Sequence, residues 1–246
     1  MSEPILRMDK VAKSFGGLRA VDGASFDINP GEIVGLIGPN GAGKTTVFNL
    51  ISGYFAPSEG SIFFKGQKIN GQRPYQMAKK GIGRTFQVVK PFPGLTVLEN
   101  VVIAALCKHH RRADAEKHAW KILEFTGLAN RAEQSAASLT LPGRKRLEIS
   151  KALALDPELL LLDEVVAGLN PTEADQTIQL ILKIRDQGIS ILIVEHIMRV
   201  IMNISDNLVV LNFGSMIATG KPVEIVKNEQ VIQAYLGKEE SGVPLK

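Results

Sequence analysis

One eight-residue stretch has the glycines and the lysine that are typical of a phosphate-binding loop. Gly38-Pro39-Asn40-Gly41-Ala42-Gly43-Lys44-Thr45 fits G-x-x-x-x-G-K-[ST] at every fixed position. The glycines let the backbone turn tightly and point successive N–H groups at phosphate oxygens. We expect Lys44 to reach the β- and γ-phosphates and the hydroxyl of Thr45 to bind Mg²⁺. The stretch, with Thr46 after it, therefore predicts a site for ATP or another nucleoside triphosphate.

Two acidic residues follow a run of four leucines more than a hundred residues later. The segment Leu159-Leu160-Leu161-Leu162-Asp163-Glu164 is typical of a buried strand that carries carboxylates at its C-terminal end, where ligands gather in open α/β sheets. We expect Asp163 to bind Mg²⁺ and Glu164 to accept the proton of an attacking water. Taken alone, such a run can equally be a strand that enters a polar loop. Together with the phosphate loop, it predicts an ATP-hydrolysing site.

Three single residues are weaker candidates for the same site. Gln87 follows a strand-like segment, so its amide can reach a metal ion or a water, although surface glutamines are usually just solvated. His196 follows the apolar run Ile189-Ser190-Ile191-Leu192-Ile193-Val194, from which its imidazole can hydrogen-bond a γ-phosphate, although a lone histidine there is usually structural. Phe15 precedes Gly16-Gly17 and can stack on a purine base, but its residue type alone favours core packing.

The elements that position these residues alternate between strands and helices. An apolar strand over 32–37 precedes the phosphate loop and a helix follows it, as the motif requires. The segment from Ile5 to Phe26 predicts short strands and turns. From about Val88 to Leu155, apolar residues recur at spacings of three and four, which predicts a helical insert. Within the insert, Pro142 and Gly143 precede a helix whose N-terminus has potential affinity for anions.

Composition limits the class of protein. The chain has 246 residues, 45% of them hydrophobic, which suits one large α/β domain or a domain with a subdomain. Its apolar runs are far shorter than a membrane span needs, and the N-terminus does not have the pattern of a signal peptide, so we expect a cytosolic location. The single cysteine, Cys107, excludes an internal disulfide. The net charge of +4 permits contact with nucleic acid or a membrane surface but requires neither.

A histidine-containing turn is the other candidate for metal binding. Lys108-His109-His110-Arg111-Arg112 is followed by His118. Adjacent histidines do not share a helix face, and neither a cysteine nor a carboxylate cluster accompanies them in the sequence. We therefore expect a solvated basic turn rather than a set of ligands.

Along essentially its whole length, the chain resembles the ATP-binding subunits of ABC transporters. The resemblance rests on the order of an aromatic residue, the phosphate loop (Walker A), Gln after Thr-Phe, a signature, Walker B with its Glu, a Gly-Leu-Asn-Pro loop and a histidine. Three phrases look like the subunits of branched-chain amino-acid uptake systems: Gly83-Arg84-Thr85-Phe86-Gln87, Arg146-Leu147-Glu148-Ile149 and Gln233-Ala234-Tyr235-Leu236-Gly237.

The resemblance implies a fold and a role for each motif. It implies a single α/β domain over 1–246, with a RecA-like P-loop ATPase core (about 1–87 and 156–246), an N-terminal antiparallel β region and a helical subdomain (about 88–155). The implied roles are adenine stacking for Phe15, the Q-loop near Mg²⁺ and the membrane subunit for Gln87, the general base for Glu164, the switch histidine for His196, and the D-loop for Ala167-Gly168-Leu169-Asn170.

The sequence departs from the family pattern at two places. The usual signature Leu-Ser-Gly-Gly-Gln, which caps the γ-phosphate held by the opposing subunit, is here Leu139-Thr140-Leu141-Pro142-Gly143. Thr140 keeps a hydroxyl, but Pro142 stands where the second glycine is usual and has no N–H to donate. The N–H of Gly143 can replace that donor only if the turn shifts. Val165 replaces the usual proline after the Walker B glutamate, which changes little because that proline supplies only backbone shape.

The resemblance also implies a place in an assembly. We expect the ATP-hydrolysing subunit of an importer of branched-chain or related amino acids, held at the cytoplasmic face of the inner or plasma membrane. Its partners would be a second ATPase subunit, identical or different, integral permease subunits and, indirectly, a substrate-binding protein. The alternative is an ABC-type ATPase that acts on nucleic acid or ribosomes, but such proteins tend to have two ATP-binding halves or a coiled-coil insert, and neither appears here. A P-loop kinase would need a phosphoryl-acceptor site, whereas Glu164 suits water.

Overall fold

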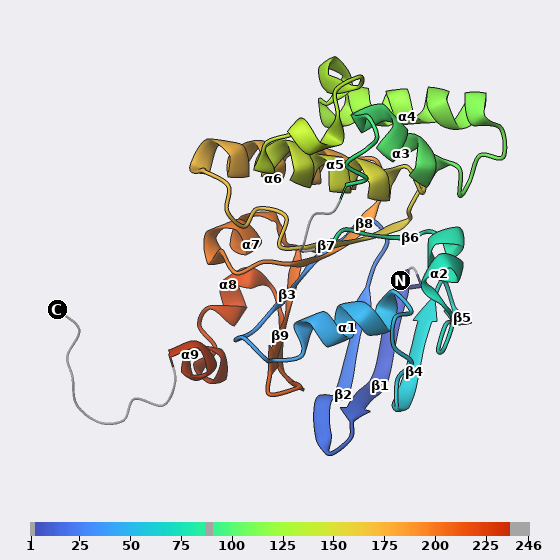
Figure 1. Cartoon of the computed structure of the whole chain (residues 1–246). Helices are drawn as coiled ribbons and strands as arrows, with labels where there is room; N and C mark the ends of the chain where they lie inside the picture. The colour runs from blue at the N-terminus through green and yellow to red at the C-terminus, as the bar shows by residue number, and fades with distance from the viewer. Residues whose placement is uncertain (1–2, 87–90, 237–246) are drawn as a thin grey trace.

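Parallel and antiparallel strands join into one curved sheet. The computed structural model describes residues 3–86 and 91–236. Within these ranges, ten strands follow the spatial order β5-β4-β1-β2-β10-β9-β3-β8-β7-β6 (Figure 1). The strands are β1 (Leu6–Phe15), β2 (Leu18–Ile28), β3 (Ile33–Ile37), β4 (Glu59–Phe64), β5 (Gln67–Lys68), β6 (Ile82–Arg84), β7 (Leu159–Asp163), β8 (Ser190–Val194), β9 (Asn207–Asn212) and β10 (Ser215–Gly220).

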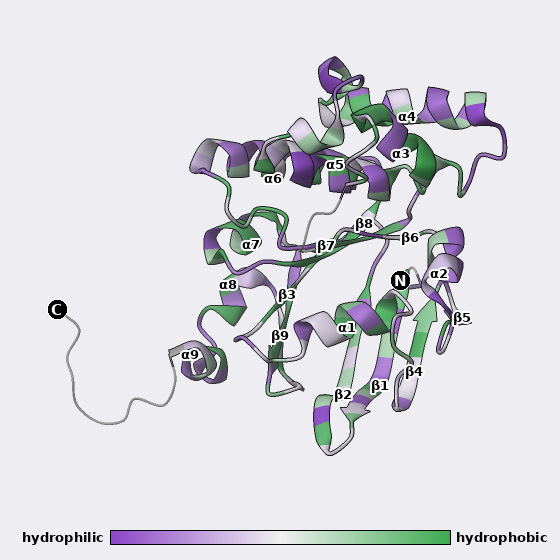
Figure 2. Ribbon diagram, viewed as in Figure 1, coloured by the Kyte–Doolittle hydropathy of each residue, from purple (hydrophilic) through white to green (hydrophobic). Residues whose placement is uncertain are grey.

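The helices lie on both faces of this sheet and at one end of it (Figure 1). They are α1 (Lys44–Ile51), α2 (Pro74–Lys80), α3 (Val97–Ala105), α4 (Arg112–Thr126), α5 (Leu141–Leu153), α6 (Pro171–Asp186), α7 (Met198–Ile204), α8 (Pro222–Ile225) and α9 (Glu229–Leu236). No helix in the described ranges is long and apolar enough to cross a membrane. In the two longest of these helices, α4 and α6, hydrophilic residues recur along the length (Figure 2).

The parallel part of the sheet confirms the strands expected from the apolar runs. β3 pairs in parallel with β8 and β9, and β7 pairs in parallel with β6 and β8. Every residue of β3, β7 and β8 is buried, because helices cover both faces of these strands. The C-terminal ends of β3, β7 and β8 therefore reach the same edge of the sheet, and each of them leads into a predicted site motif.

An antiparallel part formed by the N-terminal strands is present, as the family resemblance implies, and β9 and β10 also pair antiparallel. β1 pairs antiparallel with β2 and β4. The prediction of short strands over Ile5 to Phe26 is wrong, because β1 has 10 residues and β2 has 11. The pairing of β1 with β2 shifts register after Met8, Val11 and Lys13. Such irregularities break the alternation of buried and exposed side chains, so a long strand looks interrupted in sequence.

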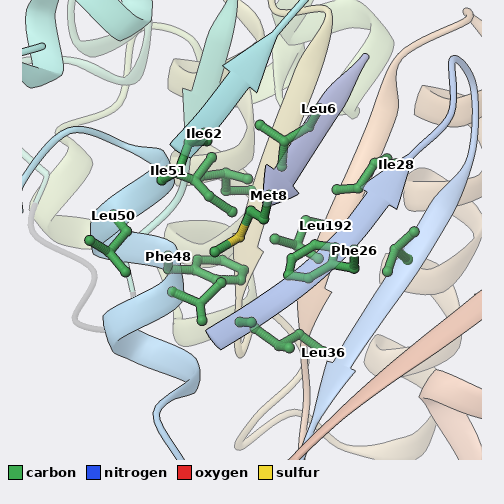
Figure 3. Close-up of a cluster of buried hydrophobic side chains, with 14 of the residues drawn as sticks. Leu6, Met8, Phe26, Ile28, Leu36, Phe48, Leu50, Ile51, Ile62 and Leu192 are labelled. Carbon is green, nitrogen blue, oxygen red and sulfur yellow. The ribbon is translucent and has the colours of Figure 1, made fainter. Parts of the chain in front are cut away.

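Helix α1 is fixed by packing between the two parts of the sheet. Phe48 and Ile51 point from α1 toward Met8 of β1 (Figure 3), in a cluster that also includes Leu50 of α1 and Leu192 of β8. Phe48 is fully buried, so its truncation to alanine would cost about 3–5 kcal/mol of stability. This packing fixes the N-terminus of α1, and with it the loop that precedes the helix.

Helices α3, α4 and α5 lie close together (Figure 1), and they have an apolar cluster of their own. Leu123 of α4 and Leu147 of α5 lie in it, fully buried. Ile149 lies on another face of α5 and packs into the cluster that covers the parallel strands. Helix α5 therefore joins the helical part to the sheet. The exact boundaries of the subdomain, about 88–155, stay a prediction.

Candidate nucleotide site

The predicted phosphate loop connects β3 to α1 in a shape that two of its glycines make possible. Gly38 has φ +149° and Gly43 has φ +102°. A Cβ atom on Gly38 would lie 2.1 Å from the carbonyl oxygen of Leu211, and one on Gly43 would lie 2.5 Å from that of Ala20. Any other residue at these positions would therefore displace the backbone. The strand, loop and helix confirm the context that the motif requires.

Lys44 points back into the loop. Its ammonium donates hydrogen bonds to the carbonyl oxygens of Gly38 (2.7 Å) and Pro39 (2.9 Å), and the side chain is buried. Burial lowers the pKa of Lys44, while the carboxylates of Glu164 and Asp163 act in the opposite direction. The lysine charge thus lies where the loop and the two acids converge.

A cleft of about 540 Å³ brings residues from distant parts of the sequence together. The residues that line it are Phe15, Leu18, Arg19, Ala20, Asn40, Gly41, Ala42, Gly43, Lys44, Thr45, Thr46, Glu164, Val194, His196, Phe213 and Gly214. Most of the residues predicted for the nucleotide are therefore on one surface. The volume is within the range of about 300–1,000 Å³ that is usual for small-molecule sites. Gln87 lies outside the described residues.

Two aromatic side chains lie at the rim of this cleft. The side chain of Phe15 is 41% exposed and its ring meets Phe55 edge-on, with 5.0 Å between ring centroids. Core packing, which the sequence alone favours for Phe15, is therefore wrong. Phe213 is 88% exposed and was missed by the sequence reasoning. It has φ +45° and precedes Gly214 in the turn between β9 and β10. An aromatic residue beside a glycine was the only sequence signal.

Asp163 ends β7 and is paired with a residue that the sequence reasoning also missed. Nη2 of Arg84 lies 3.3 Å from Oδ2 of Asp163; Asp163 is buried, and the side chain of Arg84 is 10% exposed. Arg84 also donates to Oδ1 of Asn49 (2.6 Å) and Oγ of Ser52 (2.9 Å) in α1 and just after it. Burial raises the pKa of Asp163, and the Arg84 charge opposes that shift. Arg84 lies at the end of β6, three residues before Gln87, and nothing in its own residue type marks it.

Glu164 and His196 form a close pair at the ends of two adjacent strands. Nε2 of His196 lies 2.7 Å from Oε1 of Glu164. Glu164 has a left-handed backbone with φ +51°, and its N–H donates to the carbonyl of Val194 at 2.9 Å. That backbone bond holds the residue after β7 against the end of β8. The carboxylate is therefore fixed beside the imidazole at the cleft.

Lys145 and Glu195 hold the backbone of the turn that follows β7. The ammonium of Lys145 in α5 donates to the backbone carbonyl of Glu164 at 2.5 Å. The N–H of Val166 donates to Oε1 of Glu195 at 2.8 Å. Burial raises the pKa of Glu195 to about 7, against the effects of the Val166 hydrogen bond and the Lys145 charge. Both residues were missed, because a lysine within a helix and a glutamate beside a histidine are common in any sequence.

The signature and the D-loop lie away from the cleft of their own chain. Thr140 and Leu141 are exposed at the start of α5, where Pro142 occupies the first turn. None of residues 140–143 is among those that line the cleft. The D-loop ends at Asn170, which caps α6 by accepting the N–H of Glu173 at 3.0 Å.

Comparisons with known proteins agree with this arrangement. The profile of the ABC transporter family matches residues 21–167, and that of the branched-chain amino acid ATP-binding cassette transporter family matches residues 215–241. The chain is 41% identical over 254 residues to the high-affinity branched-chain amino acid transport ATP-binding protein LivG of Escherichia coli (strain K12), across 97% of this chain and 100% of that protein.

Solved structures extend the agreement to the fold. The ADP conformation of MJ1267, an ATP-binding cassette of an ABC transporter, has a TM-score of 0.88 and 32% identity, covering 96% of this chain and 100% of its own. A dimeric post-hydrolysis state of the ATP-binding cassette MJ0796, bound to ADP and Pi, has a TM-score of 0.79 and 26% identity, covering 88% and 98%. The chain therefore belongs to the ABC transporter family, among its ATP-binding subunits.

Proposed function

We propose that this chain is the ATP-hydrolysing subunit of an importer that takes up branched-chain or related amino acids. The observation that carries the ATPase is the meeting of Lys44, Glu164 and His196 at one cleft. Support for the substrate class comes from the similarity to LivG and from the C-terminal family match at 215–241. Neither the described residues nor the comparisons favour action on nucleic acid or ribosomes.

In this proposal the phosphate loop binds the β- and γ-phosphates of ATP. Lys44 exchanges its two bonds to loop carbonyls for phosphate oxygens, which accept stronger, charge-assisted hydrogen bonds. The N-terminus of α1 contributes its free N–H groups and positive end. Phe15 stacks on the adenine at the rim, since its exposed ring faces the same cleft.

The residues near the phosphate end fit a magnesium ion. Thr45 offers a hydroxyl and Asp163 a carboxylate, and oxygen ligands of this kind are what Mg²⁺ prefers. Gln87 would add an amide oxygen. The ion would supply charge neutralisation for the phosphates. Arg84, on Oδ2 of Asp163, fixes the direction in which the carboxylate faces.

Glu164 acts as the general base. Its carboxylate accepts one proton from a water, the water oxygen bonds to the γ-phosphorus, and the bond from that phosphorus to the bridging oxygen of ADP breaks. His196 donates a hydrogen bond to Oε1 of Glu164 or to the γ-phosphate. It therefore orients the carboxylate, and it links the γ-phosphate to the segment that follows β8. The rigid turn after β7 keeps the base in reach of the water.

A second ATPase subunit would complete the site. Residues 140–143 do not line the cleft of their own chain, and the related MJ0796 cassette is dimeric with ADP and Pi bound. Two subunits therefore close face to face, with the signature of each over the nucleotide of the other; in this chain the signature donors are Thr140 and Gly143. Permease subunits, and a substrate-binding protein beyond them, would couple this closure to transport from the cytoplasmic face of the membrane.

Uptake by cells tests the whole proposal. Deletion of the gene should lower uptake of labelled leucine, isoleucine or valine, and expression of the wild type or of Glu124→Gln, an exposed residue of α4, should restore it. Glu164→Gln should not restore it. In the same cells, the tagged chain should co-purify with integral membrane proteins rather than with ribosomes or nucleic acid. Unchanged uptake of all three amino acids, with loss of uptake of another solute, would refute the substrate class and leave the ATPase standing.

A further inference from the structure

Two histidines and an aspartate meet at a place remote from the nucleotide cleft. His109 follows α3, His118 lies in the second turn of α4, and Asp156 lies between α5 and β7. One possible ligand atom from each lies within 4.8 Å of the other two. The expectation of a solvated basic turn is therefore wrong for His109 and His118, which are half-buried, although it holds for the exposed His110. The sequence could not reveal the cluster because its carboxylate comes 38 residues after His118.

The ring nitrogens of this cluster lack the partners that buried polar atoms need. Nε2 of His109 and Nε2 of His118 are both inaccessible to solvent, and neither makes a hydrogen bond with the residues that the structure describes. Oδ1 of Asp156 lies 3.1 Å from Nε2 of His118, but not in a direction that suits a hydrogen bond, and Oδ2 is 3.7 Å from Nε2 of His109. An unsatisfied buried polar atom costs about 1–3 kcal/mol, so two of them facing one carboxylate call for a ligand.

We propose that His109, His118 and Asp156 bind a zinc ion, with a water as the fourth ligand. Two imidazoles and one carboxylate suit Zn²⁺ and neighbouring first-row metals, whereas Mg²⁺ and Ca²⁺ prefer oxygen atoms alone. Bonds of about 2.0–2.2 Å in tetrahedral geometry would place the three atoms roughly 3.4 Å apart. From separations of at most 4.8 Å, side-chain rotations can reach that arrangement. Asp156 is half exposed, which leaves solvent access for the water.

The charges around the cluster are compatible with this ion. The two rings lie 4.6 Å apart between centroids. The proposed ligands are two imidazoles and one carboxylate, and a metal binds an imidazole in its neutral form. Asp156 supplies the negative charge that offsets the ion.

The position of the site indicates a structural role. His109 and His118 belong to the helical part, and Asp156 directly precedes the strand β7 that carries Asp163 at its other end. An ion held by all three would brace α3 and α4 against the start of β7. The inference does not depend on the proposed transport function, and it predicts stabilisation of the fold rather than a step in hydrolysis.

Metal binding by the untagged, EDTA-treated full-length chain without nucleotide tests the proposal. Titration with ZnCl₂ in a calorimeter, together with metal analysis after gel filtration, should give one Zn²⁺ per chain. His118→Ala and Asp156→Asn should each weaken binding at least tenfold. Asparagine tolerates the left-handed backbone of Asp156, which has φ +46°, so this second variant stays informative if the first does not fold. Substitution with Co²⁺ should give the strong visible absorption of a tetrahedral site.

Two neighbouring residues provide matched controls. His110→Ala removes the adjacent exposed histidine and Cys107→Ser removes the exposed thiol, and both variants should bind Zn²⁺ as tightly as the wild type. Zn²⁺ should also raise the midpoint of thermal unfolding in the wild type and in both controls, but not in Asp156→Asn. The proposal is overturned if the wild type takes up no stoichiometric Zn²⁺, or if His118→Ala and Asp156→Asn bind it as tightly as the wild type.

Discussion

The ammonium of Lys145 lies 2.5 Å from the backbone carbonyl oxygen of Glu164, to which it donates a hydrogen bond. One helix, α5, thus starts with the signature and then supports the turn that carries the proposed base. Glu164 holds a left-handed backbone, with φ +51°, which for a residue with a side chain persists only where its surroundings enforce it. Lys145 is part of that enforcement.

Replacement of Lys145 by methionine should therefore loosen the turn while keeping the apolar part of the side chain. The variant loses the charge-assisted hydrogen bond and leaves the carbonyl of Glu164 without its donor. This should lower the free energy of unfolding by about 1–3 kcal/mol, partly offset because a buried charge is removed. ATP turnover should fall roughly tenfold, equivalent to about 1.4 kcal/mol. Urea unfolding and steady-state ATPase assays measure both, with Lys183→Met on the exposed face of α6 as control. Equal turnover in the two variants would contradict the support role.

Lys44→Ala should abolish turnover. The lysine brings a positive charge to the β- and γ-phosphates, and its loss commonly costs about 2–4 kcal/mol, or roughly thirty- to a thousandfold in rate. Steady-state ATP hydrolysis and binding of a fluorescent ATP analogue would be measured beside Lys227→Ala, an exposed residue remote from the cleft. Turnover at the wild-type rate in Lys44→Ala would disprove the assignment of the loop.

Glu164→Gln should separate ATP binding from hydrolysis. Glutamine keeps an oxygen that can accept a hydrogen bond from His196, but it does not take up the proton of the attacking water. The variant should bind ATP and remain in a closed dimer, which size-exclusion chromatography with ATP and Mg²⁺ would detect. If it hydrolyses ATP normally, or stays monomeric where the wild type with its partner dimerises, another residue is the base.

Glu195 should make stability depend on pH. Burial raises the pKa of this carboxyl from 4.5 to about 7, so between these values the folded state holds a proton that the unfolded state has released. Stability contributed by that proton is present at low pH and falls as pH rises through this window, with a total loss of roughly 3 kcal/mol. The sign follows because the folded state binds more protons than the unfolded state does.

Glu195→Gln should remove this dependence, since glutamine can still accept the Val166 N–H. The unfolding free energies of wild type and variant would be measured by urea denaturation at about pH 5 and about pH 8. The variant should gain stability relative to the wild type on going to the higher pH. Parallel pH profiles for the two proteins would show that the carboxyl titrates normally.

The residues that sequence could predict are those whose pattern is local. The phosphate loop and the acids after Leu162 follow apolar strands, and the structure gathers Lys44 and Glu164 at one cleft as expected. The pairs of Arg84 with Asp163 and of Lys145 with Glu164 could not be predicted. Each joins residues of common types from distant segments, and they meet only because β6 pairs with β7 and α5 packs against the sheet.

The hydrogen-bond donors of the signature differ from the family pattern. Pro142 stands in the first turn of α5 where the second glycine is usual, and proline has no N–H to give to a γ-phosphate. Thr140 keeps an exposed hydroxyl, whereas the backbone of Gly143 is buried beneath Leu139. One neutral hydrogen bond contributes about 0.5–1.5 kcal/mol, so the site that this signature caps should be weakened rather than inactive.

We therefore expect the chain to work best opposite a different ATPase subunit whose signature is intact. The signature of that partner would close over the intact Walker A and Walker B motifs of this chain. The nucleotide bound by the partner would face the weaker signature of this chain. ATPase rates should be slow for the chain alone, faster with the sister subunit, and partly rescued in Pro142→Gly alone. If the homodimer already hydrolyses ATP at the full rate and Pro142→Gly changes nothing, Thr140 and the following turn cap the phosphate adequately. The proposal of an asymmetric pair would then fail.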